Sequence, residues 1–480
     1  MNKSGKRAPK KKDKGSMDRL HLNTRVFLWV FLGMFVFLGS YTFYTVQVNG
    51  STWFASSYNT RLKSAQKRVV VGNILDRDGM VLADTDGDGN RSYPLERGQR
   101  LALCHVLGDP AGVAPGVDTT YAGYLLGFNN SVFEKAYQAI NLEKPRGNDV
   151  AITLDADLQF AAASAMDGKK GAVALINYKT GEVLALYSSP GFDPANVSDY
   201  LEGTDSELVN RATNGKYPPG SIFKIVTVAA YLEAGYSMDD TYLCEAELIV
   251  NGQKIVDQAD HAHGEQTVTE ALNNSCNIAF AQMAQKVGQE QLLKTAKAFG
   301  FNEGVLYSDL QLAKSSVTFD EGDGDDALAW AACGQHKDLI TPLQAAMMIG
   351  AIANDGEMME PKLLYEVTNS RGDVVKSLNS SVAHRATSSQ NAQIIQQMLI
   401  STVEQGTASA ARIDGYTVGG KTGTAQPGGD QENHAWFVAY VQDDAHPLAV
   451  AVVVENGGTG GKVAGPVAAQ MLKAALGEDN

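Results

Sequence analysis

An uncharged apolar segment near the N-terminus constrains the fold of this chain more than any other feature of its sequence. Residues 26–48 contain no charged side chain, and Leu, Phe and Val dominate them. Because about 20 apolar residues in a helix cross the hydrocarbon core of a bilayer, the segment predicts a transmembrane helix at 26–48. A cleavable signal peptide is the alternative, but the apolar part of such a peptide is usually shorter. Tyr41, Phe43 and Tyr44 also resemble the aromatic residues that lie at membrane interfaces.

The charges on either side of this segment predict its orientation. Residues 1–25 carry nine Lys or Arg against two Asp, whereas the whole chain has a net charge of −14. Because basic flanks stay on the cytoplasmic side, we expect a cytoplasmic tail at 1–25 and an acidic remainder outside the cytoplasm. Contact of this tail with anionic membrane lipids is favoured over nucleic-acid binding.

Three short motifs further along the chain each occur twice. They are Ser-x-x-Lys at Ser221–Lys224 and Ser64–Lys67, Ser-x-Asn at Ser275–Asn277 and Ser57–Asn59, and Lys-Thr-Gly at Lys421–Gly423 and Lys179–Gly181. One copy of any of these motifs carries little information. The surrounding sequence therefore has to separate a functional copy from a chance one.

The two Ser-x-x-Lys copies differ in what precedes and follows them. Ser221 follows Tyr-Pro-Pro-Gly at 217–220 and begins an apolar run. Prolines followed by a small polar residue are typical of a helix start. Ser64 lies in a basic, polar stretch without such a start, so we assign Ser221 and Lys224 to the functional set.

The two Lys-Thr-Gly copies also differ in context. Lys179 lies between apolar runs at 171–178 and 182–187, which predicts two strands joined by a hairpin turn. Lys421 follows a Gly-Gly pair and precedes an apolar strand at 435–441. The functional set therefore comprises the copies that begin at residues 221, 275 and 421.

This set predicts acyl transfer through a serine ester. A serine hydroxyl needs a base to take its proton, and Lys224 lies one helical turn after Ser221. Lysine acts as a base near neutral pH only when burial or a nearby cation lowers its pKa, and Lys421 is a candidate for that cation. Ser275 is expected to relay a proton to the leaving amine, and Asn277 to orient the acyl amide.

The strand that begins at Lys421 is expected to bind substrate. The backbone N–H of Ser221 and one from the strand edge at Gly423 and Thr424 are candidates for an oxyanion hole. Gly423 is expected to let the substrate approach the strand closely. Lys421, Thr422 and Thr424 are expected to bind a carboxylate of the substrate between them.

The three motifs, in this order, resemble those of penicillin-binding proteins and serine β-lactamases. The chain is most similar to a class B penicillin-binding protein of the short type that is paired with a membrane glycosyltransferase. Further similarity to that class occurs at residues 68–83, 149–159, 189–194 and 334–344. The sequence departs from the family at His336, where glycine is usual, and at Asn73.

The pattern of elements and the resemblance together predict an α+β fold, with helices packed on an antiparallel sheet in the transpeptidase domain. Strands are expected within 171–187 and 435–454, and helices at 221–234, 281–299, 341–353, 389–405 and 466–476. The expected domains are a cytoplasmic tail at 1–25, a transmembrane helix at 26–48, a small mostly β or irregular pedestal at 49–148, and a penicillin-binding transpeptidase domain at 149–480.

The resemblance implies a peptidoglycan D,D-transpeptidase in a bacterial cell membrane that binds β-lactams covalently. Its expected partners are D-Ala-D-Ala stem peptides and a membrane glycosyltransferase of the shape, elongation, division and sporulation type. The docking residues would be Trp53, Phe54 and Tyr58. A D,D-carboxypeptidase, a β-lactamase, a β-lactam sensor and a non-catalytic cell-wall scaffold are the alternatives. A sensor would need a signalling output, and a β-lactamase would need a base for deacylation. The sequence indicates neither of these.

No cofactor and no metal are expected. Residues 84–90 imitate the first half of a calcium loop but have Leu95 at the twelfth position, where a bidentate carboxylate is required. Asp260-His261-Ala262-His263 has too few ligands at metal spacing and is interpreted as a loop. The four cysteines, Cys104, Cys244, Cys276 and Cys333, are interpreted as buried or unpaired thiols, although the sequence leaves disulfide pairing open.

Overall fold

A computed structural model describes residues 14–54, 68–86, 89–110, 112–141, 144–257, 261–303, 307, 309–429 and 431–478. The chain divides into two compact units, Met1–Phe54 and Ala55–Asn480. Ser64, Ser57 and Tyr58, to which predictions were attached above, lie outside the described residues, as do the side chains of Trp53 and Phe54.

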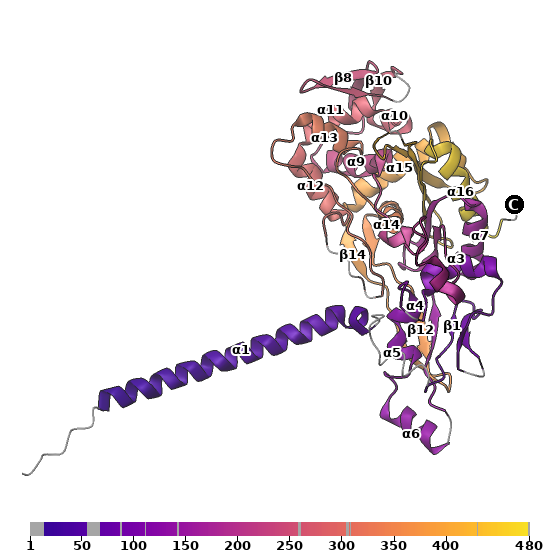
Figure 1. Cartoon of the computed structure of the whole chain (residues 1–480). Coiled ribbons are helices and arrows are strands. Elements are labelled where there is room, and N and C mark those ends of the chain that lie inside the picture. The colour runs from indigo at the N-terminus through magenta and orange to yellow at the C-terminus, as the bar shows by residue number, and fades with distance from the viewer. Residues whose placement is uncertain are drawn as a thin grey trace, which may run out of the picture. The chain divides into compact units, whose positions relative to one another are not determined.

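The first unit contains one long helix, α1 (Lys14–Phe54) (Figure 1). Its apolar part, Leu22–Thr45, has 24 residues and a mean hydropathy of 2.0. At 1.5 Å per residue this part is roughly 36 Å long, which exceeds the hydrocarbon thickness of a bilayer. Among the described residues it is the one helix that is long and apolar enough to cross a membrane. It overlaps the predicted segment at 26–48.

A five-stranded antiparallel sheet is the centre of the second unit. Its strands follow the order β15-β16-β17-β5-β6. Their bounds are β5 (Gly171–Asn177), β6 (Val183–Ser189), β15 (Val418–Ala425), β16 (His434–Val441) and β17 (Leu448–Val454). Every residue of β16 and β17 is buried. Because successive side chains of a strand point to opposite faces, both faces of the sheet are covered.

Two pairs of helices cover this sheet. One pair is α7 (Ala156–Met166) with α16 (Gly460–Ala475), and the other is α14 (Pro342–Ala353) with α15 (Ser389–Gln405) (Figure 1). Asp155, Thr341 and Ser388 cap the N-termini of α7, α14 and α15 by accepting a backbone N–H in the first turn. The predicted α+β class, with helices packed on an antiparallel sheet, is confirmed.

A second, six-stranded sheet joins distant parts of the sequence. Its order is β13-β12-β4-β1-β2-β3, with β4 parallel to β1 and antiparallel to β12. The strands are β1 (Ile74–Leu75), β2 (Val81–Thr85), β3 (Arg91–Ser92), β4 (Asp149–Ile152), β12 (Leu364–Thr368) and β13 (Val374–Ser377). The sheet therefore crosses the boundary expected near residue 148, and the division of the second unit at that position stays a prediction.

The segment before β4 also carries the helices α3 (Arg97–Leu107), α4 (Val117–Thr120), α5 (Ala122–Leu125) and α6 (Val132–Ile140). A buried ion pair of 2.9 Å between Arg91 and Asp118 connects β3 to α4.

A mostly helical lobe adjoins the edge strand β15. Its helices are η2 (Gly220–Phe223), α9 (Lys224–Glu233), α10 (Val268–Asn273), α11 (Asn277–Val287), α12 (Gln289–Ala298) and α13 (Asp325–Ala332). The short helix α8 (Arg211–Asn214) packs instead against β5, β6 and α14. Its strands β7 (Thr241–Cys244) and β10 (Gly264–Thr267) form one antiparallel pair, and β8 (Glu247–Val250) and β9 (Gln253–Val256) another. The remaining elements are η1 (Pro194–Tyr200), β11 (Glu357–Met359), β14 (Val382–Arg385) and η4 (Ser409–Ala411).

The helical run predicted at 281–299 is two helices in the structure. The chain breaks at Gly288, which has a φ of +78° and lies between α11 and α12. Glycine adopts such a conformation without the steric cost that other residues have. The apolar periodicity continues through this break, which is why the sequence pattern did not indicate it.

Candidate active site

Ser221 lies in a tight turn where the helical lobe meets the edge strand of the sheet. The turn η2 passes directly into α9, and Ser221 is 5% exposed. Gly220, just before it, has a φ of +54°, and a Cβ at this position would lie 2.6 Å from the carbonyl oxygen of Thr424. Glycine is therefore required for η2 to approach β15 so closely, and this approach places the candidate nucleophile beside the Lys-Thr-Gly strand.

Lys224 begins α9 and is completely buried. Its Nζ donates to the side-chain oxygen of Asn277 at 2.8 Å and to the carbonyl oxygen of Ser275, and it lies 3.5 Å from Ser275 Oγ. Lys224 and Ser221 both belong to the part of the chain that the structure describes, and the Nζ of Lys224 makes no hydrogen bond to the Ser221 hydroxyl there, although the two residues are one turn apart. Catalytic hydrogen bonds are often long in a free enzyme and shorten when substrate binds.

Ser275 joins the two lysines. It lies between α10 and α11 with a φ of +59°, and its hydroxyl accepts a hydrogen bond of 2.9 Å from the Nζ of Lys421. A positive φ is uncommon for serine and costs free energy. The strained backbone places the hydroxyl beside both amines, and Asn277, two residues later, begins α11.

Both lysines have lowered pKa values. Burial is the main cause of the lowered pKa of Lys224. Burial also places the pKa of Lys421 well below its usual range, and the charge of Lys224 lowers that pKa further. A buried amine with a low pKa is neutral in a larger fraction of molecules at neutral pH, and the neutral amine is the form that takes a proton.

The candidate residues line or adjoin a cavity of about 490 Å³. Ser221, Asn277 and Thr424 are on its wall, and Lys224, Ser275 and Lys421 lie behind it, linked by the hydrogen bonds described above. The structure therefore brings together all three motif copies chosen from the sequence. It also places on this wall residues that no motif indicated, namely Val256, Asp257, Trp330, Cys333, Gln335, Gln426, Asn433 and Thr459.

Gln335 connects the wall of this cavity to the substrate-binding strand. Its amide donates to the carbonyl oxygen of Thr424 at 3.0 Å and accepts from the backbone N–H of Gln426 at 3.2 Å. The preceding residue, Gly334, has a φ of +73° and accepts a hydrogen bond from the N–H of Gly220. The segment 334–335 thus fixes η2 and β15 relative to each other. Sequence similarity singled out this segment, but it did not indicate this role.

The reason expected for glycine at position 423 is not the one that the structure shows. A Cβ at Gly423 would lie 2.8 Å from Trp436 and 3.0 Å from Ile222. These atoms belong to the packed interior of the protein, so a side chain here would disturb the contact between η2 and the sheet. Thr422 also faces protein, because its hydroxyl donates to Thr407 at 2.9 Å.

The rejected Lys-Thr-Gly copy lies elsewhere. Lys179 is in the turn between β5 and β6, where its amine forms an ion pair with Asp444 and its side chain is 42% exposed. It does not line the 490 Å³ cavity. The hairpin predicted for this segment is present, with β5 and β6 antiparallel.

His336, at a position where the family that the sequence resembles usually has glycine, is held by an acidic turn. Its Nε2 lies 3.0 Å from Asp323, and its ring stacks on Phe319 at 5.7 Å. Asp323 also pairs with Lys337 at 3.1 Å. The histidine therefore ties the segment that follows Gln335 to the loop before α13.

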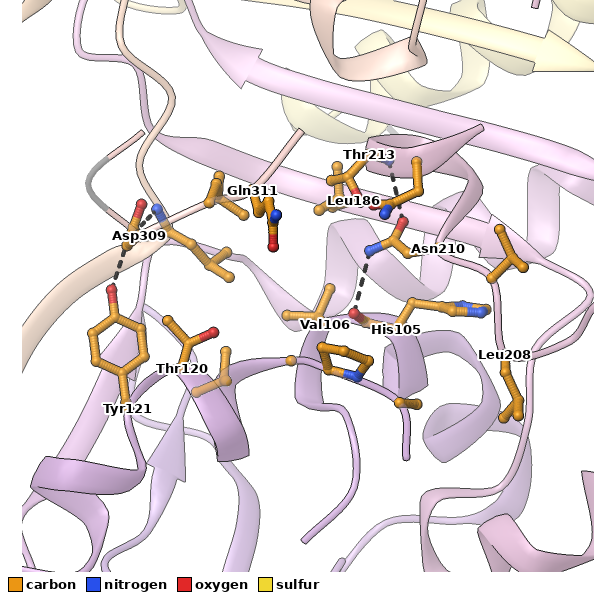
Figure 2. Close-up of a pocket in the computed structure, with 18 residues that line it drawn as sticks. His105, Val106, Thr120, Tyr121, Leu186, Leu208, Asn210, Thr213, Asp309 and Gln311 are labelled. Carbon is orange, nitrogen blue, oxygen red and sulfur yellow. Dashed lines mark hydrogen bonds between the residues drawn. The ribbon is translucent and has the colours of Figure 1, made fainter. Parts of the chain in front are cut away.

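A second cavity, of about 410 Å³, lies away from the motif residues (Figure 2). Residues of the N-terminal segment line it together with residues after β6. At one end Tyr121 donates to Asp309 at 2.9 Å, and at the other Asn210 donates to the carbonyl oxygen of His105 at 3.3 Å. Burial raises the pKa of Asp309. No residue of the three motifs lines this cavity, so the 490 Å³ cavity is the candidate active site.

Comparison with known proteins agrees with this geometry. Residues 171–473 match the family model described as the penicillin-binding protein transpeptidase domain, and the chain belongs to that family. The peptidoglycan D,D-transpeptidase PbpA of Mycolicibacterium smegmatis is 29% identical over an alignment of 468 positions that covers 87% of this chain and 93% of the relative. PbpA of Mycobacterium tuberculosis is 33% identical over an alignment of 369 positions, which covers 69% of this chain and 73% of that relative.

Among solved structures, penicillin-binding protein A from M. tuberculosis in a ceftriaxone acyl-enzyme complex superposes with a TM-score of 0.79. The two chains are 29% identical, and the match covers 86% of this chain and 99% of that one. The similarity therefore includes the N-terminal part of the second unit as well as the transpeptidase region.

Proposed function

We propose that this protein is a membrane-anchored class B peptidoglycan D,D-transpeptidase. The observation that carries the proposal is the position of Ser221 on the wall of one cavity, with Lys224 and Lys421 buried behind it and the hydroxyl of Ser275 between the two amines. Family membership and relatives named as D,D-transpeptidases support the same conclusion. The substrate would be a stem peptide that ends in D-Ala-D-Ala.

The first half of the reaction forms an acyl-enzyme. Ser221 Oγ attacks the penultimate D-Ala carbonyl, and the neutral amine of Lys224 takes the hydroxyl proton. The backbone N–H groups of Ser221 and Thr424 stabilise the oxyanion that develops. As the carbon–nitrogen bond breaks, Ser275 passes a proton to the departing amine of the terminal D-Ala, and Lys421 stabilises the charges around this hydroxyl.

The second half transfers the acyl group. An amine of a neighbouring stem peptide attacks the ester carbonyl, its proton returns through the same groups, and Ser221 leaves as a hydroxyl. Thr424, on the wall of the cavity with Lys421 behind it, holds the terminal carboxylate of the donor in the first half, and Asn277 orients its amide. A β-lactam would acylate Ser221 by the same first step.

A donor and acceptor assay separates transpeptidation from its alternatives. With a pentapeptide donor and an excess of an amine acceptor, the full-length protein in detergent is expected to release D-Ala and form the cross-linked product, both measured by mass spectrometry. A carboxypeptidase would release D-Ala but yield mainly the hydrolysed tetrapeptide. A sensor or a scaffold would release no D-Ala above the level of the Ser221→Ala variant.

The helix α1 is proposed to cross the membrane with its basic N-terminal side in the cytoplasm. Its apolar part, Leu22–Thr45, is long enough, and the positive charges of residues 1–25 favour this orientation. The catalytic unit would then lie outside the cytoplasm, where peptidoglycan is assembled.

A membrane glycosyltransferase is the proposed partner, since transpeptidation needs a newly made glycan strand near Ser221. Photo-crosslinkers at positions 30–60 are expected to trap a multi-pass membrane polymerase, detected by immunoprecipitation and peptide mass spectrometry. A crosslinker at Asp444, which is exposed on the second unit, is the control. Replacement of α1 by an unrelated anchor should impair growth and leave penicillin acylation unchanged. Full complementation by the exchanged anchor would show that the helix is only a tether.

A further inference from the structure

Four side chains that can bind a metal lie together beside the active site. Cys244 ends β7, Asp257 follows β9, His263 precedes β10, and Cys276 caps the N-terminus of α11. One ligand atom from each of them lies within 4.8 Å of those of the other three. Pairing of β7 with β10 places residue 244 opposite residue 264, and this register brings Cys244 next to His263.

The separations among three of these atoms are close to the edges of a tetrahedron of ligands around zinc. The Sγ of Cys244 lies 3.5 Å from Asp257 Oδ2 and 3.6 Å from His263 Nδ1, and Asp257 Oδ2 lies 3.0 Å from that Nδ1. Bonds of 2.0–2.3 Å to zinc place neighbouring ligand atoms about 3.3–3.8 Å apart in a tetrahedron. Three of the six separations are therefore close to these edges, and the Sγ of Cys276 lies within 4.8 Å of the other three ligand atoms.

The environment of the cluster is that of a built site. Cys276 is completely buried, Cys244 is 1% exposed and Asp257 4% exposed, and the side chain of His263 is 16% exposed. The backbone N–H of Ala279 donates to the Sγ of Cys276 at 3.4 Å, which fixes the position of this sulfur at the start of α11. Two sulfur ligands, an imidazole and a carboxylate suit zinc and do not suit calcium or magnesium, which take oxygen ligands.

We propose that Cys244, Asp257, His263 and Cys276 bind one zinc ion that holds the Ser275–Asn277 segment in place. Cys276 lies between the two active-site residues. Asp257 uses its other oxygen to accept the backbone N–H of Asn277 at 3.3 Å, and the Nδ2 of Asn277 donates to the carbonyl of Val256 at 3.0 Å. Because four protein ligands fill a tetrahedral zinc, the ion would position Ser275 and Asn277 and leave no place for substrate on the metal.

The spacing along the chain does not indicate this set. His263 belongs to the fragment at 260–263 that was interpreted as a loop, and its co-ligands are 6, 13 and 19 residues away. Strand pairing assembles them. A disulfide between Cys244 and Cys276 is the competing arrangement, since extracytoplasmic cysteines tend to be oxidised, and the experiment has to distinguish the two.

The test measures metal in the full-length protein purified in detergent. Wild-type protein incubated with zinc and freed of excess metal is expected to retain about one zinc per chain, measured by plasma mass spectrometry. Exchange for Co²⁺ should give a near-ultraviolet charge-transfer band from thiolate to cobalt. Cys244→Ser and His263→Ala should lose the zinc and weaken or abolish this band.

Two matched variants serve as controls. His261 has its ring 5.2 Å from that of His263 but is not in the cluster, and Cys104 is a buried thiol in another part of the fold. His261→Ala and Cys104→Ser should keep both zinc and the cobalt band. If Cys244→Ser does not fold, the comparison of His263→Ala with His261→Ala and the cobalt titration of wild type still decide the question.

Two results would overturn the proposal. One is wild-type protein that retains less than about a tenth of an equivalent of zinc and gives no cobalt band. The other is an intact mass about 2 Da below that of the reduced chain, with a linked peptide that contains Cys244 and Cys276, because loss of two hydrogens marks a disulfide. Neither result affects the proposed transpeptidation, since the serine, the two lysines and the cavity do not depend on the ion.

Discussion

Replacement of Ser221 by alanine is expected to abolish covalent labelling of the protein by a fluorescent penicillin. The reason is chemical, because the ester bond to the β-lactam carbonyl can form only through the hydroxyl of this residue. Alanine is smaller than serine, and Ser221 is buried in the turn η2, so the fold should be retained. Intact mass spectrometry of the full-length protein after incubation with penicillin measures the result directly.

The matched control is Ser64→Ala, which removes the hydroxyl of the other Ser-x-x-Lys copy and should leave labelling at the wild-type level. A circular dichroism melt of both variants checks that neither loses its fold. Detection of the adduct on any residue other than Ser221, or persistent labelling of Ser221→Ala, would show that the wrong serine was assigned.

Replacement of Lys421 by alanine is expected to slow acylation by about 10²–10³-fold, which corresponds to roughly 3–4 kcal/mol of lost electrostatic stabilisation. The amine of Lys421 donates to Ser275 Oγ at 2.9 Å and to the carbonyl oxygen of Thr422 at 3.0 Å, and it is completely buried. Its removal takes away the hydrogen-bond donor beside the hydroxyl of Ser275, which is the proposed proton relay. Stopped-flow measurement of acylation by a chromogenic cephalosporin gives the rate constant.

Lys179→Ala provides the comparison, since it removes a lysine from the same tripeptide in a different environment. The ion pair of Lys179 with Asp444 is largely exposed, and such surface pairs contribute only about 0–1 kcal/mol. The acylation rate of this variant should stay within about twofold of wild type. Equal losses in the two variants would mean that the copies were assigned to the wrong roles.

The parts of the fold that could be predicted from the sequence are those with a local signal. The hairpin at 171–187 has two apolar runs around a turn, and prolines come just before the turn η2 that leads into α9, so local preference and tertiary structure agree. The match of 171–473 to the transpeptidase family bears out the class of protein that the three motifs predicted.

Features that depend on contacts between distant segments were not predictable in this way. Pairing of β12 with β4 joins residues more than 200 positions apart, and no local pattern encodes that choice. Trp330 and Thr459 reach the cavity only because α13 and the start of α16 converge on it. The role of Gly423 was misjudged for the same reason, since its neighbours Trp436 and Ile222 belong to other elements.

The position of β4 in the middle of its sheet has a consequence for how this protein matures. The strand has β1 on one side and β12 on the other, so one neighbour is made early in synthesis and the other only after residue 364. A chain that is exported while it is being made would hold the β4 edge without its second partner until most of the transpeptidase region has crossed the membrane. During that interval an unpaired strand edge is open to the wrong partners, and the N-terminal sheet can close only after β12 has been made.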